Sequence, residues 1–335
     1  MTAPTPRRLR HLAVAIIAAS PLVVAACSSE GGNAGQPAAA TSSTEVADLT
    51  TTGATAPEVP AGGFQVATHT ETLVDPTRPT PDLPETGVPP SAQRTIETTF
   101  TYPDAAGAFP LVVFAHGHNG HPRKFTQLFE AWAAAGFVVA APSFPLSNDE
   151  VPGAASVFDL PGQSGDLTFV ISEALRRSGE PGDALQGRVN PEEIAVGGLS
   201  LGGATVYSSA FDDCCRDRRI DAVMVLDAPH PDASGLDLAL GLPLLIMHAD
   251  GDPVIPYSSA EEAFEAAATP KYLVTIHEAV HASPYEDTPD PADELVLATT
   301  TAFWRLHLAH DADAAVELSR AARVPGLTTV VENPG

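Results

Sequence analysis

Short apolar segments alternate with amphipathic segments through most of this chain. The apolar segments have few polar positions, as do strands that are buried on both faces of a sheet; they lie at residues 110–117, 137–144, 193–200, 220–229, 242–252 and 271–279. The segments between them place apolar residues at helical spacing, at residues 125–136, 166–179, 201–211, 258–268 and 291–309. This alternation predicts an α/β fold in which helices cover both faces of a mostly parallel sheet.

The limits of this fold also follow from the pattern. Residues 94–103 alternate between apolar and polar positions, which predicts an early antiparallel strand. Asp166 is expected to cap the helix that begins there. The stretch from Ala228 to Gly241 is too short for a lid domain. We therefore expect one α/β domain over residues 64–312, followed by a C-terminal tail over residues 313–335.

Length and charge narrow the function classes. The chain has 335 residues, of which 44% are hydrophobic, and this is enough for one sizeable core. Its 17 basic residues face 42 acidic ones, the formal net charge is -25, and no run of basic residues follows Arg10. Because nucleic acids attract basic surfaces, this balance argues against a nucleic-acid partner.

The N-terminal residues have the organisation of a secretion signal. Basic residues at 7–10 precede an apolar stretch at 12–19, which Pro21 ends, so the stretch is shorter than the roughly 20 residues of a spanning helix. The small residues before Cys27 resemble the lipobox of bacterial lipoproteins. That resemblance implies that residues 1–26 are removed, that Cys27 is lipidated, and that the protein is exported and held at the membrane. The alternative is an ordinary cleaved signal with Cys27 left free.

The stretch that follows the signal is low in apolar residues. Residues 27–63 consist largely of Ser, Thr, Gly, Ala and Pro. Burial of so few apolar side chains cannot offset the conformational entropy that folding removes, so we expect a flexible tether.

Two further cysteines are adjacent in the sequence. Cys214 and Cys215 are the only cysteines besides Cys27. Since an exported compartment permits disulfides, the sequence is compatible with a bond between these neighbours, with two free thiols, or with an intermolecular bridge.

A Gly-x-Ser-x-Gly motif supplies the candidate nucleophile. Gly198-Leu199-Ser200-Leu201-Gly202 lies between a predicted strand and a predicted helix, where a sharp turn raises Ser200 to the carboxyl edge of the sheet. Gly198 and Gly202 leave room for the close backbone approach in such a turn. The N-terminus of the following helix favours negative charge that develops there. The alternative is a Gly-rich loop with an idle serine.

A serine nucleophile needs a base that an acid orients. Asp250 and Asp252 follow one predicted strand, and His277 and His281 lie near the end of the next, so these side chains can meet Ser200 at the carboxyl edge of the sheet. Asp252 lies in a turn and is the candidate acid, whereas Asp250 is expected to structure that loop. His281 lies in a polar loop and is the candidate base, whereas His277 is expected to be packed in the core.

Four segments around these residues, VVFAHGHNG, GGLSLGG, HADGDPVIP and VHASPYED, resemble the α/β-hydrolase superfamily. TLVDPTRPTP followed by RTIETTFTYP is further similar to secreted bacterial hydrolases of the dienelactone-hydrolase and platelet-activating-factor-acetylhydrolase kind. The resemblance spans about residues 64–310. It implies an α/β-hydrolase fold and a carboxylic ester hydrolase whose triad is Ser200, Asp252 and His281, without a cofactor.

The same resemblance implies two oxyanion donors. In this superfamily the turn after the strand that ends in His-Gly supplies one of them, which maps to the backbone N–H of His118; the other is the N–H of Leu201. Dienelactone hydrolases proper carry cysteine as the nucleophile, and this chain departs from them in having Ser200. Without a lid, the acyl site is expected to be open or shallow.

The sequence HGHNGH at residues 116–121 offers a different hypothesis, a zinc site. It resembles the zinc motif of metallo-β-lactamase-type hydrolases, but Gly120 stands where that motif has Asp. The next histidine is His230, and zinc hydrolysis needs three or more protein ligands and an open position. We therefore expect no metal. A third hypothesis, a non-catalytic surface binding lipoprotein of the same fold, conflicts with the complete set of Ser, Asp and His.

Overall fold

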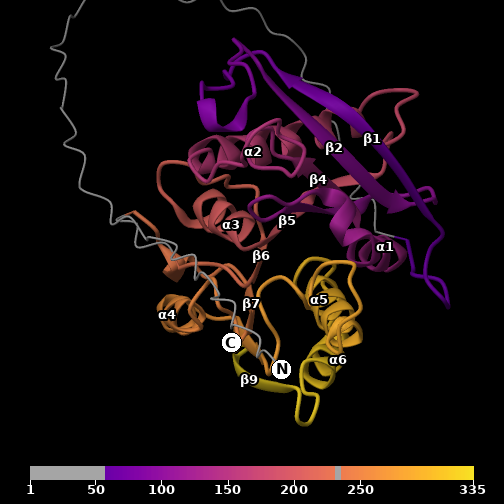
Figure 1. Cartoon of the computed structure of the whole chain (residues 1–335). Helices are drawn as coiled ribbons and strands as arrows, with labels where there is room; N and C mark the ends of the chain where they lie inside the picture. Colours follow the sequence, from indigo (N-terminus) through magenta and orange to yellow (C-terminus); the bar gives the residue numbers. More distant parts are fainter. Residues whose placement is uncertain (1–56, 231–234) are drawn as a thin grey trace, which may run out of the picture. The chain divides into compact units, whose positions relative to one another are not determined.

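A computed structural model describes residues 57–230 and 235–335. These residues form a nine-stranded sheet in the order β1-β2-β4-β3-β5-β6-β7-β8-β9, which can be followed in Figure 1. Strands β3 to β8 are parallel to their neighbours among themselves, whereas β1, β2 and β9 run antiparallel to the strands beside them. The bounds are Val66–Asp75 (β1), Arg94–Pro103 (β2), Phe109–Ala115 (β3), Val138–Ser143 (β4), Val189–Leu199 (β5), Ala222–Leu226 (β6), Leu244–Ala249 (β7), Lys271–Ile276 (β8) and Thr328–Asn333 (β9). The predicted, mostly parallel α/β sheet is confirmed.

Helices cover both faces of this sheet. One buried apolar cluster joins the sheet to α2 (Leu160–Ser178), α3 (Leu201–Phe211) and α4 (Ser258–Ala266). A second cluster joins it to α1 (Thr126–Ala134), α5 (Asp293–His307) and α6 (Ala314–Ala321). Figure 1 shows the two groups on opposite sides of the strands. The part of the chain that the structure describes also has three short 3-10 helices: η1 (Pro84–Thr86), η2 (Pro122–Phe125) and η3 (Leu238–Leu240).

The central strands explain why the sequence pattern is continuous rather than alternating. In β3, Val113 packs into the first cluster and Val112 and Phe114 into the second, because successive side chains point to opposite faces and both faces are covered by helices. At the end of this strand Ala115 is in register with Gly198 of β5. The turns that follow β3 and β5 therefore start side by side at the carboxyl edge of the sheet.

Three local predictions differ from the structure. The segment at residues 313–335, predicted as a tail, contributes α6 and the edge strand β9, which pairs with β8 from Lys271 to Ile276. Strand β1 is also absent from the prediction. It lies at the edge of the sheet, and its residues alternate between more exposed and less exposed positions. Asp166 does not cap α2, because this helix begins at Leu160 and Asp166 lies inside it, where it binds an arginine.

Several predictions fall outside the described residues. The signal at residues 1–26, the lipidation site Cys27 and the tether up to residue 56 belong to this group. Within the described ranges, no helix is long and apolar enough to cross a bilayer. Between β6 and β7, the three-residue helix η3 is the one helix or strand among the described residues.

Candidate active site

Ser200 occupies the sharp turn between β5 and α3. Its φ of 55° and ψ of -119° belong to a sparsely populated region, which a non-glycine residue adopts only when its surroundings impose it. The surroundings do so here: the N–H of Ser200 donates to the carbonyl of Leu226 (2.9 Å). Gly202 is also required, since a Cβ there would lie 2.1 Å from the carbonyl oxygen of Ala115. The turn thus raises the hydroxyl of Ser200 above the sheet edge.

The structure brings Asp252 and His281 to this hydroxyl. Nε2 of His281 lies 2.9 Å from Oγ of Ser200, and Nδ1 of the same ring lies 2.6 Å from Oδ2 of Asp252. The carboxylate of Asp252 is fully buried, whereas the side chain of His281 is 16% exposed. Asp252 also accepts hydrogen bonds from the N–H groups of Val254 and Ile255, which fix its orientation. A proton of Ser200 can therefore pass to an imidazole whose far side faces a buried carboxylate.

Asp250 and His277 form a second acid–imidazole pair outside this site. Nδ1 of His277 lies 2.7 Å from Oδ2 of Asp250, and Nε2 of His277 lies 2.8 Å from Oγ1 of Thr329. Asp250 also accepts from the N–H of Glu278, which fits its expected role in the loop. The prediction that His277 is packed in the core is wrong: its side chain is 34% exposed, because it follows the last residue of β8 and lies between polar partners.

Asp227, at the carboxyl end of β6, is a buried acid that the sequence reasoning missed. It accepts hydrogen bonds from the N–H of Ala249 (2.8 Å), the N–H of Ala282 (3.2 Å) and the hydroxyl of Tyr285 (3.2 Å). Its Oδ2 lies 4.0 Å from Nδ1 of His281. Burial raises the pKa of this carboxyl, while His248 and the hydrogen bond from Ala249 oppose the rise. Asp227 therefore ties the loop of His281 to the ends of β6 and β7.

One signal in the sequence could have identified Asp227. The residue directly follows the apolar run of β6, as Asp252 follows that of β7, and carboxyl ends of parallel strands meet at one edge. Within the described ranges, Asp227, Asp252 and His281 are the group of potential metal-ligand side chains whose atoms lie within 4.8 Å of one another. Both ring nitrogens of His281 already face Ser200 and Asp252, so the geometry fits a proton relay.

The turn after β3 lies against the nucleophile. A Cβ at Gly117 would lie 3.2 Å from Cβ of Ser200, so the backbone of Gly117 packs closely against the nucleophile, and His118 is the next residue of this turn. Within residues 57–230 and 235–335, the N–H groups of His118 and Leu201 donate to no protein acceptor. Leu201 is the first residue of α3, where helical N–H groups have no intrahelical partner. Leu201 directly follows Ser200, and the turn that carries His118 begins against Ser200, so these two N–H groups are the candidate oxyanion donors.

The three imidazoles of residues 116–121 point to separate partners. His116 is buried, and its Nε2 accepts from the N–H of Phe144 while its Nδ1 donates to the carbonyl of Gly117. Nε2 of His118 binds the carbonyl of Ala155, and Nδ1 of His121 accepts from the N–H of Arg123. The rings fix the loop rather than converge, which does not favour the zinc hypothesis.

The free energy of unfolding is expected to fall as the pH is lowered from about 6.5 to about 4. Burial lowers the pKa of His116 from 6.5 to about 4, so in this range the unfolded chain binds a proton that the folded chain does not. The stability that neutral His116 supplies is complete above pH ~6.5 and declines toward the folded pKa, by about 2 kcal/mol at pH ~5. Urea unfolding at pH ~7 and at pH ~5 measures this loss of the free energy of unfolding.

The control for this prediction is His116→Gln, which keeps a neutral polar side chain without a titrating group. Its loss of stability between pH ~7 and pH ~5 should be about 2 kcal/mol smaller than that of the wild type. Equal losses in the two proteins would show that His116 does not titrate as its burial requires.

Cys214 and Cys215, just after α3, are joined by a disulfide. The two residues line a surface pocket together with Arg78 and with Phe169 of α2. The structure has the bond between neighbours, which is one of the three states that the sequence left open.

One comparison with known proteins finds a match. Residues 85–231 match a family model described as Chlorophyllase. This segment is less than half of the chain; it contains the turn at residues 116–121 and Ser200, and it ends before Asp252 and His281. A search of curated proteins finds no match. Together with the sheet topology, the matched segment supports an ester hydrolase of the α/β-hydrolase superfamily.

Proposed function

We propose that this chain, which has the fold of the α/β-hydrolase superfamily, is a serine esterase that cleaves carboxylic esters through an acyl-enzyme. Ser200 is the nucleophile, His281 the general base and Asp252 the acid that orients it. The observation that carries the proposal is the continuous hydrogen-bonded chain from Ser200 Oγ through both nitrogens of His281 to Asp252. Within the serine esterases, we propose that this chain is of the dienelactone-hydrolase and platelet-activating-factor-acetylhydrolase kind, which its sequence resembles.

In the acylation step, Oγ of Ser200 attacks the ester carbonyl while Nε2 of His281 takes the hydroxyl proton. Asp252 accepts from Nδ1–H of His281 and stabilises the imidazolium that forms. The carbonyl oxygen becomes an oxyanion between the N–H groups of His118 and Leu201, which are already oriented before the substrate binds. When the tetrahedral adduct collapses, the imidazolium gives its proton to the leaving alcohol.

In the deacylation step, the same groups act on water. His281 removes a proton from a water molecule, which attacks the acyl carbonyl, and the oxyanion forms again at the same two donors. Collapse breaks the bond to Oγ of Ser200, returns the proton to that oxygen and releases the carboxylic acid. Ser200 is partly exposed, so water can reach the acyl-enzyme, which agrees with an open acyl site.

A fluorophosphonate probe tests this function directly, because it bonds covalently to activated serines. The wild-type protein is expected to be labelled, and Ser200→Ala is expected to lose the label. Ser208→Ala, a serine on the same helix α3, is the matched control and should label like the wild type. An unlabelled wild type, or a labelled Ser200→Ala variant, would overturn the proposal.

The identity of the cleaved ester is determined by comparing the wild type with Ser200→Ala. A panel of p-nitrophenyl esters of increasing chain length reports the acyl preference, and chlorophyll is included because the matched family is named for it. Hydrolysis by the wild type and none by Ser200→Ala identifies each true substrate.

A further inference from the structure

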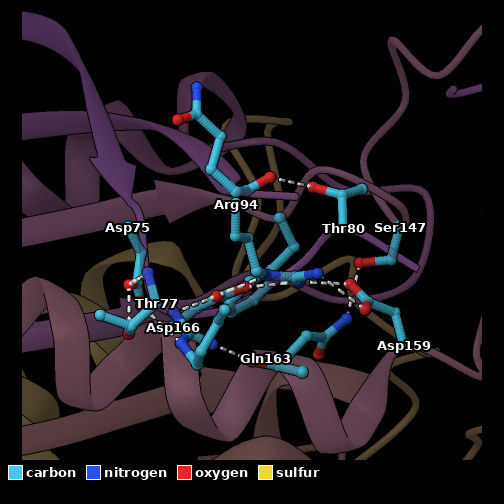
Figure 2. A network of polar contacts seen from close by, with 12 residues as sticks. Asp75, Thr77, Thr80, Arg94, Ser147, Asp159, Gln163 and Asp166 are labelled. Atoms are coloured by element: carbon cyan, nitrogen blue, oxygen red, sulfur yellow. Dashed lines mark hydrogen bonds and ion pairs between the residues drawn. The ribbon is translucent and has the colours of Figure 1, made fainter. Parts of the chain in front are cut away.

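Gln163 is a buried polar residue that links the two sides of the proposed oxyanion site. It lies in the first turns of α2 and is fully buried. Its Nε2 donates to Oγ of Ser147 (2.7 Å), and its Oε1 accepts from Oγ1 of Thr205 (2.6 Å). Figure 2 shows the amide of Gln163 directed toward Ser147 beside the charged residues of the same network. Of its two partners, Ser147 lies in the loop after β4 and Thr205 lies in α3.

On one side, Ser147 holds the turn that follows β3. Its carbonyl accepts the N–H of Asn119 (2.8 Å), and the next hydrogen bond, from the N–H of Asp149 to the carbonyl of Gly120 (3.1 Å), continues this pairing. Ser147 is itself fully buried. Because Asn119 directly follows His118, a displacement of Ser147 moves the N–H of His118.

On the other side, Thr205 belongs to the first turns of α3. Its hydroxyl lies 3.0 Å from the carbonyl oxygen of Leu201, one helical turn earlier. Leu201 supplies the second proposed oxyanion donor. The amide of Gln163 therefore spans the gap between the segment that carries one donor and the helix that carries the other.

A buried cluster of one arginine and two carboxylates fixes the helix from which Gln163 projects. Asp159, the N-cap residue of α2, precedes Gln163, and Asp166 follows it inside the helix. Both carboxylates bind the guanidinium of Arg94 at the start of β2. The shortest contacts are 2.6 Å in each pair, and all three side chains are at most 1% exposed. Figure 2 shows Arg94 between the two carboxylates. This anchor leaves Gln163 little freedom to shift.

We propose that Gln163 is a positioning residue that sets the separation of the two oxyanion donors. The inference rests on the proposed function, since it assigns those donors to His118 and Leu201. Gln163 touches neither substrate nor Ser200; it acts through Ser147 and Thr205. Donors held at the correct distance stabilise the oxyanion more than the ground-state carbonyl, so the effect falls on kcat rather than on KM.

The test is Gln163→Met, which keeps the length of the side chain and removes both hydrogen bonds. Loss of one oxyanion donor costs about 100-fold or more, and displacement costs less, so we expect kcat for a p-nitrophenyl ester to fall about 10-fold while KM changes less than about 2-fold. The inhibition constant of a trifluoromethyl ketone, whose adduct with serine carries an oxyanion, should rise by the same factor. Gln127→Met, at an exposed position of α1, is the matched control.

A double variant shows whether Gln163 acts through Ser147. Ser147→Ala should lower kcat similarly, and Ser147→Ala with Gln163→Met should be no slower than the slower single variant. A Gln163→Met protein with lower thermal stability but wild-type kcat and ketone affinity would overturn the inference and leave the proposed function intact. A wild type that hydrolyses no ester and takes no fluorophosphonate label would overturn both.

Discussion

The Asp252→Asn variant is expected to lose about four orders of magnitude in kcat, as loss of the orienting carboxylate does in serine hydrolase triads. Asn has almost the same shape, so the site should stay intact. Its amide, however, cannot supply the negative charge that stabilises the imidazolium of His281, and its N–H₂ group can face Nδ1 and favour the wrong tautomer. The substrate still binds, so KM should change much less than kcat. Steady-state hydrolysis of a p-nitrophenyl ester measures both.

Asp250→Asn is the matched control for that variant. Asp250 lies two residues earlier on the same loop and pairs with the partly exposed His277, so its kcat should stay within about 2-fold of the wild type. If Asp252→Asn kept more than about a tenth of the wild-type kcat, the orienting role would pass to Asp227, whose carboxylate lies 4.0 Å from Nδ1 of His281. Equal losses in the two variants would contradict any distinction between the two acid–imidazole pairs.

The sequence indicated the residues of the site because each follows an apolar run. In a parallel sheet such runs end at one edge, so Ser200 after β5, Asp252 after β7 and His281 after β8 could be expected to meet. The choice between Asp250 and Asp252 had weaker support, since both follow the same strand. Only the register of the loop decides that Asp252 points toward His281 and that Asp250 points toward His277.

Other features could not be read from the sequence for a physical reason. Arg94 meets Asp159 and Asp166 across more than 60 residues of chain, and no periodicity encodes such a contact. Gln163 resembles any polar residue in an amphipathic helix until Ser147 and Thr205 are placed beside it. Strand β9 is an edge strand with alternating, half-exposed positions, and its short pattern resembles a polar tail.

The Arg94→Met variant is expected to lose about 3–5 kcal/mol of the free energy of unfolding at neutral pH, because it removes the cation that the two buried carboxylates share. Among the described residues, Asp159 then has no ion-pair partner, and Asp166 keeps only Arg78, at 2.9 Å. Met replaces much of the volume, so the loss comes from charge rather than from a cavity. Burial already raises the pKa of Asp159 and that of Asp166, and Arg94 opposes the rise. Without Arg94 both pKa values rise further above those of the unfolded chain, so the penalty is complete at high pH and shrinks as acidification protonates the carboxylates.

Urea unfolding over a series of pH values measures this penalty, with Arg176→Met as the control. Arg176 of α2 pairs with Glu173 of the same helix and with Glu180 just after it, and the side chain of Arg176 is 50% exposed. The Arg176→Met variant should therefore lose less than about 1 kcal/mol of the free energy of unfolding. A loss for Arg94→Met as small as that of the control, or one that grows on acidification, would contradict the role of Arg94 as the cation of a buried cluster. A large loss for Arg94→Met that shrinks on acidification would instead tie the stability of the fold to the cluster of Arg94, Asp159 and Asp166. The charges of this cluster fix α2 on β2 and so keep the amide of Gln163 between Ser147 and Thr205.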